Sequence, residues 1–416
     1  MSAAPDTQPK PAMLSLDEAV ERLLGQVRPP GLERAETVST FDALGRVLAE
    51  DVRSLLDVPP EDNSEMDGYA LRVADVPLPR TVLRVSQRIA AGRVGTALEP
   101  GSAARIFTGA QVPAGADAVV MQELCTPVDG GVRIDAAPTS GQSIRRRGED
   151  VQRDATVLRA GLRLGPQALG MAASVGAATL KVGARPRVAL FSTGDELAMP
   201  GEVLKPGAIY NSNRFTLRGL IQAMGGICED LGIVPDRLDA TRSALKQAAE
   251  KNDLIVTCGG VSVGEEDHLR PAVEREGRLD LWQIAMKPGK PLAFGEVFRA
   301  DGSSAWFIGL PGNPVSSFIT FLLAVRPFLL KLQGATDLQP RPIPMRADFD
   351  WPKPDRRREF MRVRRNAQGG LDLFPNQSSG VLTSVVWGDG VIDNPAGKAI
   401  RAGEMVAFLP FAELLA

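Results

Sequence analysis

The chain has 416 residues, of which 44% are hydrophobic and 24% charged, and its formal net charge is −2. This composition is typical of a globular protein with several domains, and the near-neutral charge argues against a general nucleic-acid or membrane-surface binder. Three scattered cysteines and a single histidine, His268, exclude a disulfide framework and a His-rich metal site, and they leave acid–base chemistry to carboxylates and lysines.

The first third of the chain predicts a short tail, a helical segment and a β-rich module. Residues 1–12 are polar, without a signal-peptide pattern, so we expect a disordered tail and a cytoplasmic protein. Apolar residues at helical spacing follow Ser15, and Glu18 completes a capping box. A shorter helical pattern surrounds residues 43–48. Residues 58–153 form the β-rich module, with strands expected at 82–89, 103–107, 118–121 and 132–135.

The middle of the chain alternates between strand and helix. A helix at 166–177 is expected to join residues 13–57 in a helical linking domain made of 13–57 and 154–180. Residues 181–334 then predict an α/β domain, with helices capped by Asn213 and Asp239 and a last helix that begins at Asn313 and Pro314. Its mainly parallel sheet would be covered on both faces. Residues 335–416 return to short strands, which favours a C-terminal β-barrel.

Glycine-rich loops follow two of the expected α/β strands. Gly259, Gly260, Ser262 and Gly264 come directly after the apolar run 254–258, and residues 310–314 follow a second strand. Ligands of such sheets bind beyond the carboxyl ends of the strands, and glycines let backbone N–H groups close on an anion. The loop is also compatible with an ordinary strand-to-helix turn.

Charged residues near these loops suggest a phosphorylated ligand with Mg²⁺. Three acids, the last of them Asp267, follow the glycines, and Lys287 and Lys290 flank Pro288-Gly289. Glu196 follows the first α/β strand, where it either orders a cation or caps a helix. Solvated surface charges are the alternative in each case.

Two further carboxylates lie in the β-rich module. Asp67 occupies a tight turn, which is also the pattern of a structural Asx-turn, and Asp150 follows the arginine run 145–147, which is also typical of a solvated face. The residues alone lead only to a carboxylate-lined cleft for a phosphorylated ligand and Mg²⁺.

The ordered set of motifs resembles the molybdopterin molybdenumtransferase family, known as MoeA and as the E domain of gephyrin. The matching segments lie in the family's order over roughly residues 60–320 and comprise residues 64–70, 106–110, 146–150, 192–197, 259–264, 287–291 and 310–316. The resemblance implies an elongated, four-part, dimeric subunit whose catalytic domain is a three-layer α/β sandwich. It implies that molybdate is inserted into adenylylated molybdopterin with Mg²⁺-dependent release of AMP.

The resemblance also assigns roles to residues. Asp267, Glu196, Asp67 and Asp150 would be catalytic, the last two reaching in from the other subunit, and Asp267 and Glu196 would hold the metal. The substrate-binding residues would be Gly259, Gly260, Ser262, Gly264, Lys287, Lys290, Thr193, Asp195, Asp236, Pro311, Asn313, Pro314 and Arg146. Molybdate, an oxyanion, would be sought near arginines 145–147. A molybdopterin adenylyltransferase and apo-molybdoenzymes are the partners to expect.

Two departures from the family pattern and two alternatives remain. Gln283 stands where many bacterial members have a lysine, and residues 387–392 replace a common C-terminal Ala-Asn-Gly-Leu-Ile pattern. A molybdopterin adenylyltransferase is one alternative, although it would need neither the β-rich module nor the barrel. A non-catalytic, gephyrin-like scaffold is the other, although the expected acids are present.

Overall fold

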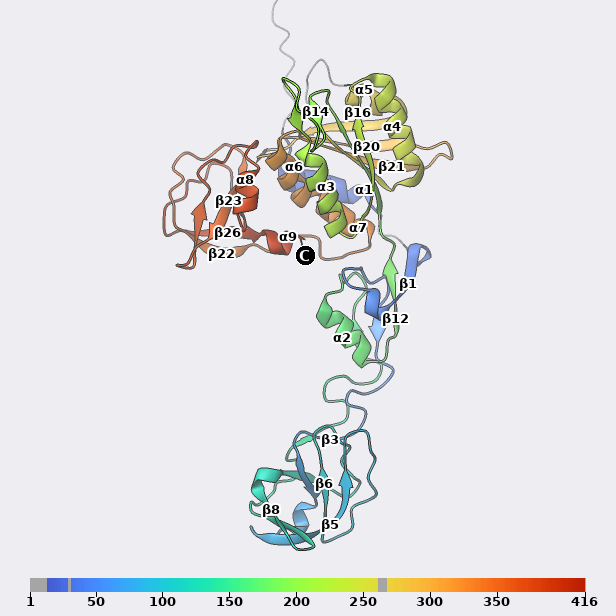
Figure 1. The fold of residues 1–416 in the computed structure, drawn as a ribbon, viewed down its shortest axis with the longest axis vertical. Helices are drawn as coiled ribbons and strands as arrows, with labels where there is room; N and C mark the ends of the chain where they lie inside the picture. Colours follow the sequence, from blue (N-terminus) through green and yellow to red (C-terminus); the bar gives the residue numbers. More distant parts are fainter. Residues whose placement is uncertain (1–12, 29–30, 261–267, 416) are drawn as a thin grey trace, which may run out of the picture.

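The protein is described by a computed structural model that covers residues 13–28, 31–260 and 268–415, and it forms an elongated molecule (Figure 1). The α/β module and the C-terminal barrel lie side by side at one end, and the β-rich module lies at the other.

Helix α1 (Leu16–Gln26) begins with the predicted capping box. The Ser15 side chain accepts from the Glu18 N–H, and the Ser15 N–H donates to the Glu18 carboxylate at 2.8 Å. The buried face of the helix, which includes Leu16, Val20 and Leu23, belongs to the core of the α/β module and contacts α7 (Arg326–Leu332). The predicted N-terminal helix is confirmed, and it packs away from the linking segment with which the sequence had grouped it.

Two segments of the chain, one before and one after the β-rich module, pair with each other between the two ends of the molecule. Strand β1 (Ala35–Ser39) pairs with β12 (Thr179–Gly183), and β2 (Val52–Arg53) pairs with β11 (Thr156–Leu158), beside helix α2 (Pro166–Ser174). The helical pattern predicted at residues 43–48 is wrong. Gly45 adopts a positive φ of 74° there, and the Leu48 N–H donates to the Leu162 carbonyl at 2.9 Å, so this backbone bonds to the other segment of the chain.

The β-rich module is built on a six-stranded sheet in the order β7-β4-β6-β5-β9-β8. The four predicted strands are confirmed to within two residues. The bounds are β4 (Gly68–Leu71), β5 (Thr81–Ile89), β6 (Ser102–Ile106), β7 (Ala118–Met121), β8 (Cys125–Val128) and β9 (Gly131–Ile134). A short pair, β3 (Asn63–Ser64) with β10 (Ile144–Arg145), lies at the end that faces the rest of the molecule (Figure 1).

The α/β module is a three-layer sandwich around the sheet β16-β13-β17-β21-β20-β18. The first four strands are parallel, β20 runs antiparallel to β21, and the edge strand β18 pairs antiparallel with β20 and so runs in the direction of the first four. The bounds are β13 (Arg187–Thr193), β16 (Ile227–Val234), β17 (Leu254–Cys258), β18 (Gly277–Gln283), β20 (Pro291–Phe298) and β21 (Ser304–Leu310). The predicted fold class is thereby confirmed.

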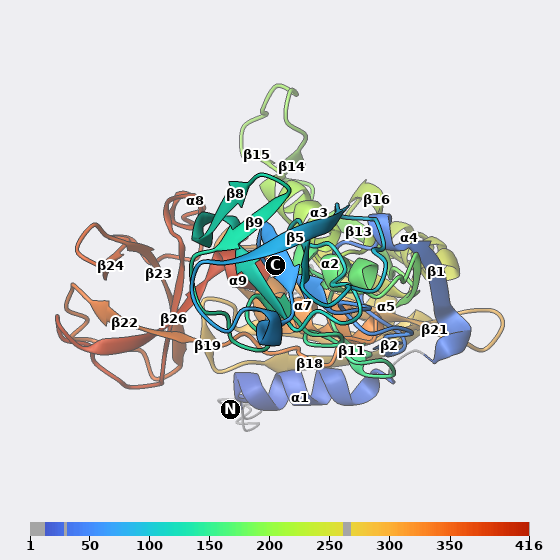
Figure 2. The same ribbon diagram turned by 90° about the horizontal axis from the view of Figure 1, so that it is seen from below.

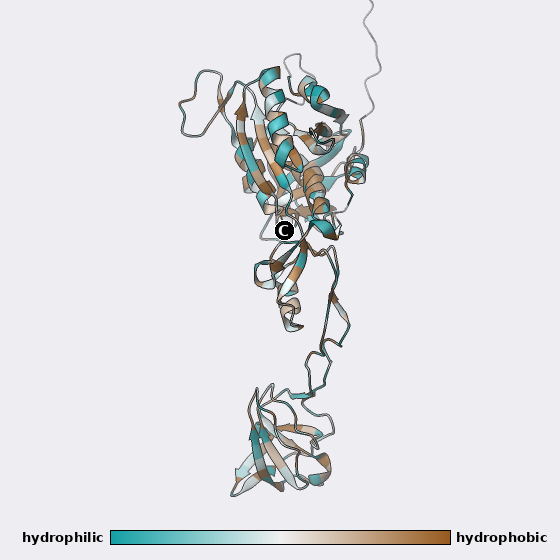
Figure 3. Cartoon of the chain, turned by 90° about the vertical axis from the view of Figure 1, so that its right-hand side faces the viewer, coloured by the Kyte–Doolittle hydropathy of each residue, from teal (hydrophilic) through white to brown (hydrophobic). Residues whose placement is uncertain are grey.

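Alternate residues of the central strands feed two separate cores. On β17, Leu254 and Val256 pack with α3 (Ser212–Ala223), α6 (Pro314–Thr320) and α7 (Arg326–Leu332), whereas Ile255 packs with α4 (Leu238–Lys251) and α5 (Leu269–Glu276). The cartoon of the central strands is accordingly coloured largely as hydrophobic in Figure 3. A strand buried on both faces reads as a continuous apolar run, as this one does.

Two predicted helix caps are wrong by two residues. Asn211, not Asn213, accepts the Arg214 N–H and caps α3, and α4 begins after Arg237, which places Asp239 in its first turn. The start at Asn313 and Pro314 is confirmed. The stretch Pro314–Leu332, which passes through a π-helical segment at Phe321–Val325, is long and apolar enough to cross a membrane, but 89% of it is buried inside the protein. It is the central core helix.

The C-terminal strands close into a barrel because β23 pairs with both β24 and β25. The bounds are β22 (Ile343–Ala347), β23 (Arg358–Arg365), β24 (Gly370–Leu373), β25 (Gly390–Asn394) and β26 (Met405–Pro410), with α8 (Thr383–Trp387) and α9 (Phe411–Leu415). Residues 387–392, which depart from the family pattern, still form the end of α8 and the start of β25. The short strand β19 (Met286–Lys287) leaves the α/β module to pair with β23.

The two-sided core of the α/β module predicts how much the free energy of unfolding falls when a buried side chain is truncated. Phe307 is fully buried on β21, whereas Phe298 on neighbouring β20 is 54% exposed. We expect Phe307→Ala to lower the free energy of unfolding by about 3–5 kcal/mol, measured by urea unfolding, and Phe298→Ala to lower it by less than about 1 kcal/mol. Equal losses for the two variants would contradict the packing described here.

A candidate binding site between the α/β module and the barrel

A cavity of about 650 Å³ lies where the α/β module meets the barrel. Its lining comes from loops that are far apart in the sequence: Glu196, Gly259, Gly260, residues 287–291, Pro311, Gly312, Asn313, Ser316, Arg357, Gln377, Ser378 and Ser379. The sheet faces the cavity with the carboxyl ends of β13, β17 and β21, the edge at which parallel sheets bind ligands.

The glycine loop approaches the end of β21 closely. The Gly259 N–H donates to the Leu310 carbonyl at 3.1 Å, and Gly259 has a φ of 91°, a region that favours glycine. A Cβ at Gly259 would lie 3.2 Å from the Thr193 carbonyl oxygen. The loop that follows β17 and the loop that follows β21 therefore begin next to each other in the cavity lining. The start of α6 at Pro314 lies beside them.

The loop containing both lysines is held by two sheets at once. It follows β18, contributes β19 to the barrel sheet, and returns as β20 of the α/β sheet. Gly289, between the lysines, has a φ of 107°, and a Cβ there would collide with the Thr320 hydroxyl. The backbone of this loop consequently has little freedom to place either lysine elsewhere.

The two lysines have different surroundings. The Lys287 ammonium lies 3.4 Å from both Asp355 and Glu359 of the barrel, and Glu359 is 2% exposed. Lys290 is exposed in the cavity and, within the described ranges, has no carboxylate within 4 Å. Lys287 thus joins the two modules, and Lys290 is the lysine whose charge is available to an anion.

Two carboxylates of the barrel, Asp355 and Glu359, are held in place around Lys287. A bidentate pair with Arg357, at 2.9 and 3.0 Å, holds the pKa of Asp355 well below its usual range. Glu359 accepts from the Trp351 indole at 2.9 Å and from the Asp355 N–H at 3.1 Å. Buried charges that are paired and hydrogen-bonded in this way are costly to disrupt, because removing one partner leaves the other uncompensated.

A buried arginine organises the barrel wall of the cavity. Arg362 is 1% exposed, and its guanidinium donates to the Ser378 carbonyl, the Ser384 hydroxyl and the Phe360 carbonyl at 3.1–3.3 Å. Its backbone exchanges two hydrogen bonds with the Gln377 amide. Burial lowers the pKa of Arg362 to about 10, so it remains a cation at neutral pH.

The barrel loop at residues 377–379, which Arg362 contacts, is also hydrogen-bonded to the α/β module. The Ser379 carbonyl accepts from the Val315 N–H in the first turn of α6 at 2.9 Å. Arg362 therefore fixes a loop that both lines the cavity and bonds across the junction. Sequence reasoning missed Arg357, Gln377, Ser378 and Ser379. The polar cluster at 376–379 was visible, but nothing in its pattern shows that it lies against the lysine loop.

Several residues predicted for the site lie near the cavity without lining it. Thr193 is buried at the end of β13, and the Asp195 carboxylate accepts from the Asp236 N–H at 3.4 Å at the same edge of the sheet. Pro314 opens α6 behind Asn313. Ser262, Gly264 and Asp267, which the sequence predicts for the site, lie outside the described residues. Gln283 is the last residue of β18, where its carbonyl accepts from the Leu14 N–H.

The predicted residues of the β-rich module lie at the other end of the same chain (Figure 1). Asp67 accepts the Thr108 N–H and hydroxyl, both at 2.8 Å, and these bonds lower its pKa. Asp150 is exposed. Arg146 is paired with Asp62 at 2.6 Å. One chain therefore does not bring these residues to the cavity.

The arginine run does not present free charge. Besides Arg146, Arg147 pairs with Asp57 at 2.7 Å, and Arg145 lies 3.9 Å from Glu149. The structure therefore favours Lys290 and its surroundings over this run as the place where an oxyanion would bind.

The described side chains offer few ligands for a metal ion. In the described part of the chain, no group of three or more His, Cys, Asp or Glu side chains is close enough to hold a metal ion. Glu196 is the one carboxylate of the described cavity lining. Mg²⁺ commonly takes one or two protein carboxylates and completes its shell with phosphate and water oxygens, so Glu196 fits a metal that arrives with a phosphorylated ligand.

Family models match almost all of the chain. The MoeA N-terminal region (domain I and II) matches residues 14–176, the probable molybdopterin binding domain matches 189–331, and the MoeA C-terminal region (domain IV) matches 344–411.

Individual relatives agree with these matches. The chain is 38% identical to the molybdopterin molybdenumtransferase of Haemophilus influenzae over 97% of this chain and 100% of that protein. It is 40% identical to molybdopterin molybdenumtransferase 2 of Mycobacterium tuberculosis over 73% and 76% of the two chains. The crystal structure of the molybdopterin biosynthesis moeA protein from Pyrococcus horikoshii OT3 superimposes with a TM-score of 0.82 at 29% identity, covering 96% and 100%.

The bonds of Arg362 predict that it positions the cavity wall. Arg362→Met would remove the donors to Ser378 and Ser384, and we expect affinity for molybdate or phosphate, measured by titration calorimetry, to fall about tenfold. Arg362→Lys, which keeps the charge but not the three-way geometry, should recover only part of that loss.

Arg364→Met supplies the matched control, because Arg364 is exposed on the same strand and stacks on Trp387. It should bind the anions like the wild type. A folded Arg362→Met protein, judged by circular dichroism, with unchanged anion affinity would refute the positioning role.

Proposed function

This chain belongs to the molybdopterin molybdenumtransferase (MoeA) family, and we propose that its reaction takes place in the cavity between the α/β module and the barrel. The protein is a transferase of molybdenum cofactor biosynthesis, with molybdopterin and molybdenum as its substrates. The observation that carries the choice of site is the exposed Lys290 ammonium among the loops at the carboxyl ends of β13, β17 and β21.

The substrate in this proposal is adenylylated molybdopterin, and AMP leaves as molybdate is inserted into the dithiolene. The Gly259–Gly260 loop, whose Gly259 N–H already donates to Leu310, would bind phosphate oxygens through the Gly260 N–H, together with the Lys290 ammonium. Molybdate would dock beside Lys290 and the Ser378 and Ser379 hydroxyls. Cleavage of the bond to AMP adds negative charge to the departing phosphate, and a fixed cation stabilises that charge more than it stabilises the ground state.

A magnesium ion is part of the proposal. Glu196, together with Asp267 of the sequence motif, would hold it against the phosphates, where it would supply Lewis-acid stabilisation of phosphate charge. The chain's own residues would bind the ligand, orient it and exclude water through the two walls of the cavity.

The remaining catalytic carboxylates would come from a second subunit. Asp67 and Asp150 belong to the β-rich module, which lies at the opposite end of the elongated chain from the α/β module and the barrel (Figure 1). A dimer in which each β-rich module reaches the cavity of its partner would bring them in twice by symmetry. Transient contacts with a molybdopterin adenylyltransferase and with apo-molybdoenzymes, and a cytoplasmic location, complete the proposal.

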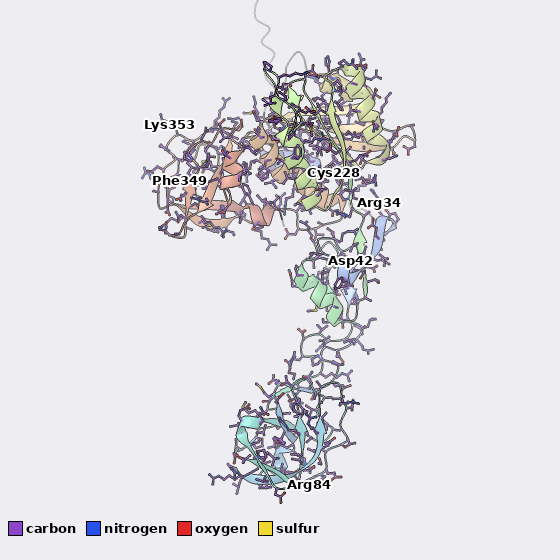
Figure 4. All side chains as sticks on the ribbon, viewed as in Figure 1. Arg34, Asp42, Arg84, Cys228, Phe349 and Lys353 are labelled. Atoms are coloured by element: carbon purple, nitrogen blue, oxygen red, sulfur yellow. The ribbon has the colours of Figure 1, made fainter. Side chains whose placement is uncertain are left out.

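Molybdate-stimulated release of AMP is the direct test. With Mg²⁺, molybdate and adenylylated molybdopterin, the wild type should release AMP and yield a cofactor that activates an apo-molybdoenzyme. Lys290→Met should reduce the rate at least about tenfold, the loss of one charged contact to phosphate. Lys353→Met, at an exposed lysine of the barrel (Figure 4), should retain full activity.

Absence of molybdate-stimulated AMP release from the wild type would eliminate the proposed reaction. Loss of activity in both lysine variants would instead show that overall charge, and not the cavity, governs binding.

Mixing mutated subunits tests the shared site. Asp67→Asn and Lys290→Met homodimers should each be nearly inactive. After exchange in equal amounts, half of the dimers are mixed and each mixed dimer has one unaltered site, so about a quarter of wild-type activity should return. Continued inactivity, with exchange verified by differently tagged subunits, would argue that each site is built from one chain.

A further inference from the structure

A row of cationic and aromatic side chains lies beside Asp67 in the β-rich module. Tyr69 of β4 pairs in register with Arg105 of β6, and Arg105 pairs in register with Arg88 of β5. Side chains in register on neighbouring strands share one face of a sheet. Phe107 lies two residues beyond Arg105 and contacts the same row.

The members of this row contact one another directly. The guanidinium carbon of Arg88 lies 4.4 Å from the centroid of the Phe107 ring, and that of Arg105 lies 4.6 Å from it. Arg105 also lies over Tyr69 at 5.2 Å. Two guanidinium groups thus share one aromatic ring.

The two arginines differ in how they are held. Arg105 donates to the Gly68 carbonyl at 2.8 Å and to the Gln122 side chain at 2.6 Å, so it is fixed within the sheet. Arg88 is exposed and stacks on Phe107, and in the described ranges no carboxylate lies within 4 Å of its guanidinium. An arginine with its plane ordered by an aromatic ring and its charge unpaired is suited to receive an anion.

The row is continuous with the Asp67 half of the site. Asp67 directly precedes β4, and the Thr108 groups that donate to its carboxylate follow immediately after Phe107. A carboxylate, a guanidinium and an aromatic ring therefore lie near one another where the central strands β4, β5 and β6 begin or end. The matching segments 64–70 and 106–110 include Tyr69, Phe107 and Thr108, but the sequence predicts a role in the site only for Asp67.

We propose that Arg88 and Phe107 form a stacking platform for a planar heterocycle that carries a phosphate group. The proposal rests on the proposed function, in which the Asp67 half of the site meets the ligand bound in the partner's cavity. Guanidinium and aromatic planes stack on heterocycles, and the guanidinium edge donates to phosphate. Adenosine monophosphate and molybdopterin both have this chemistry, and the two halves of the substrate can be tested separately.

Arg88→Met and Phe107→Leu test the platform, with Arg84→Met as the matched control. Arg84 is an exposed arginine four residues earlier on the same strand, paired with Glu99, near the far tip of the module (Figure 4). We expect the KM for adenylylated molybdopterin in the AMP-release assay to rise about tenfold in the two platform variants, with kcat within about twofold of the wild type. Arg84→Met should match the wild type, and Arg88→Lys, which lacks the planar group, should not restore the KM.

Titration calorimetry with AMP alone and with molybdopterin alone identifies the heterocycle. It is the one whose affinity is lower for Arg88→Met than for the wild type. Wild-type KM and wild-type affinity for both probes in the platform variants would overturn the proposal. An equal loss in Arg84→Met would also overturn it, because charge alone would then explain the effect. If the wild type releases no AMP, the proposed function fails, and the two binding measurements still decide whether the platform exists.

Discussion

One loop, residues 284–291, belongs to two sheets, and the candidate site depends on that sharing. Its short strand β19 pairs with β23 of the barrel, while the segments on either side continue the edge of the α/β sheet. The ion pairs of Lys287 with Asp355 and Glu359 lie at this junction. Because the loop is anchored on both sides, the barrel cannot move away from the α/β module without breaking strand pairing and exposing paired charges.

Because the loop is anchored in this way, the charged residues around the cavity have different roles. Lys287 is used to join the modules, which leaves Lys290 as the lysine that faces the cavity, and Arg362 fixes the opposite wall from inside the barrel. None of the described residues that line the cavity comes from the β-rich module, which lies at the other end of the chain (Figure 1) and, seen along the long axis, projects onto the modules behind it (Figure 2). This separation is the observation on which the proposal of a site shared between two subunits rests.

Much of the fold could be predicted because each element carries its own local signal. The capping box at Ser15, the doubly buried strand at Leu254–Cys258 and the Asn313-Pro314 start were all legible, and loops at the carboxyl ends of parallel strands gave one wall of the site. The barrel wall could not be predicted from the sequence, because the contact between Ser379 and Val315 joins two segments whose sequence patterns are unrelated. The unequal roles of Lys287 and Lys290 likewise depend on Glu359, which lies 72 residues away from Lys287 in sequence.

The central claim is that the barrel forms a wall of the binding site, and equilibrium binding of molybdate tests it most directly. The variants to compare with the wild type are Lys290→Met, on the α/β side, and the double variant Ser378→Ala with Ser379→Ala, on the barrel side. The account predicts that both bind molybdate at least about tenfold more weakly, because each removes contacts to the same anion. Wild-type affinity in the serine variant, with weakened binding in Lys290→Met, would contradict it and leave the α/β module as the whole site.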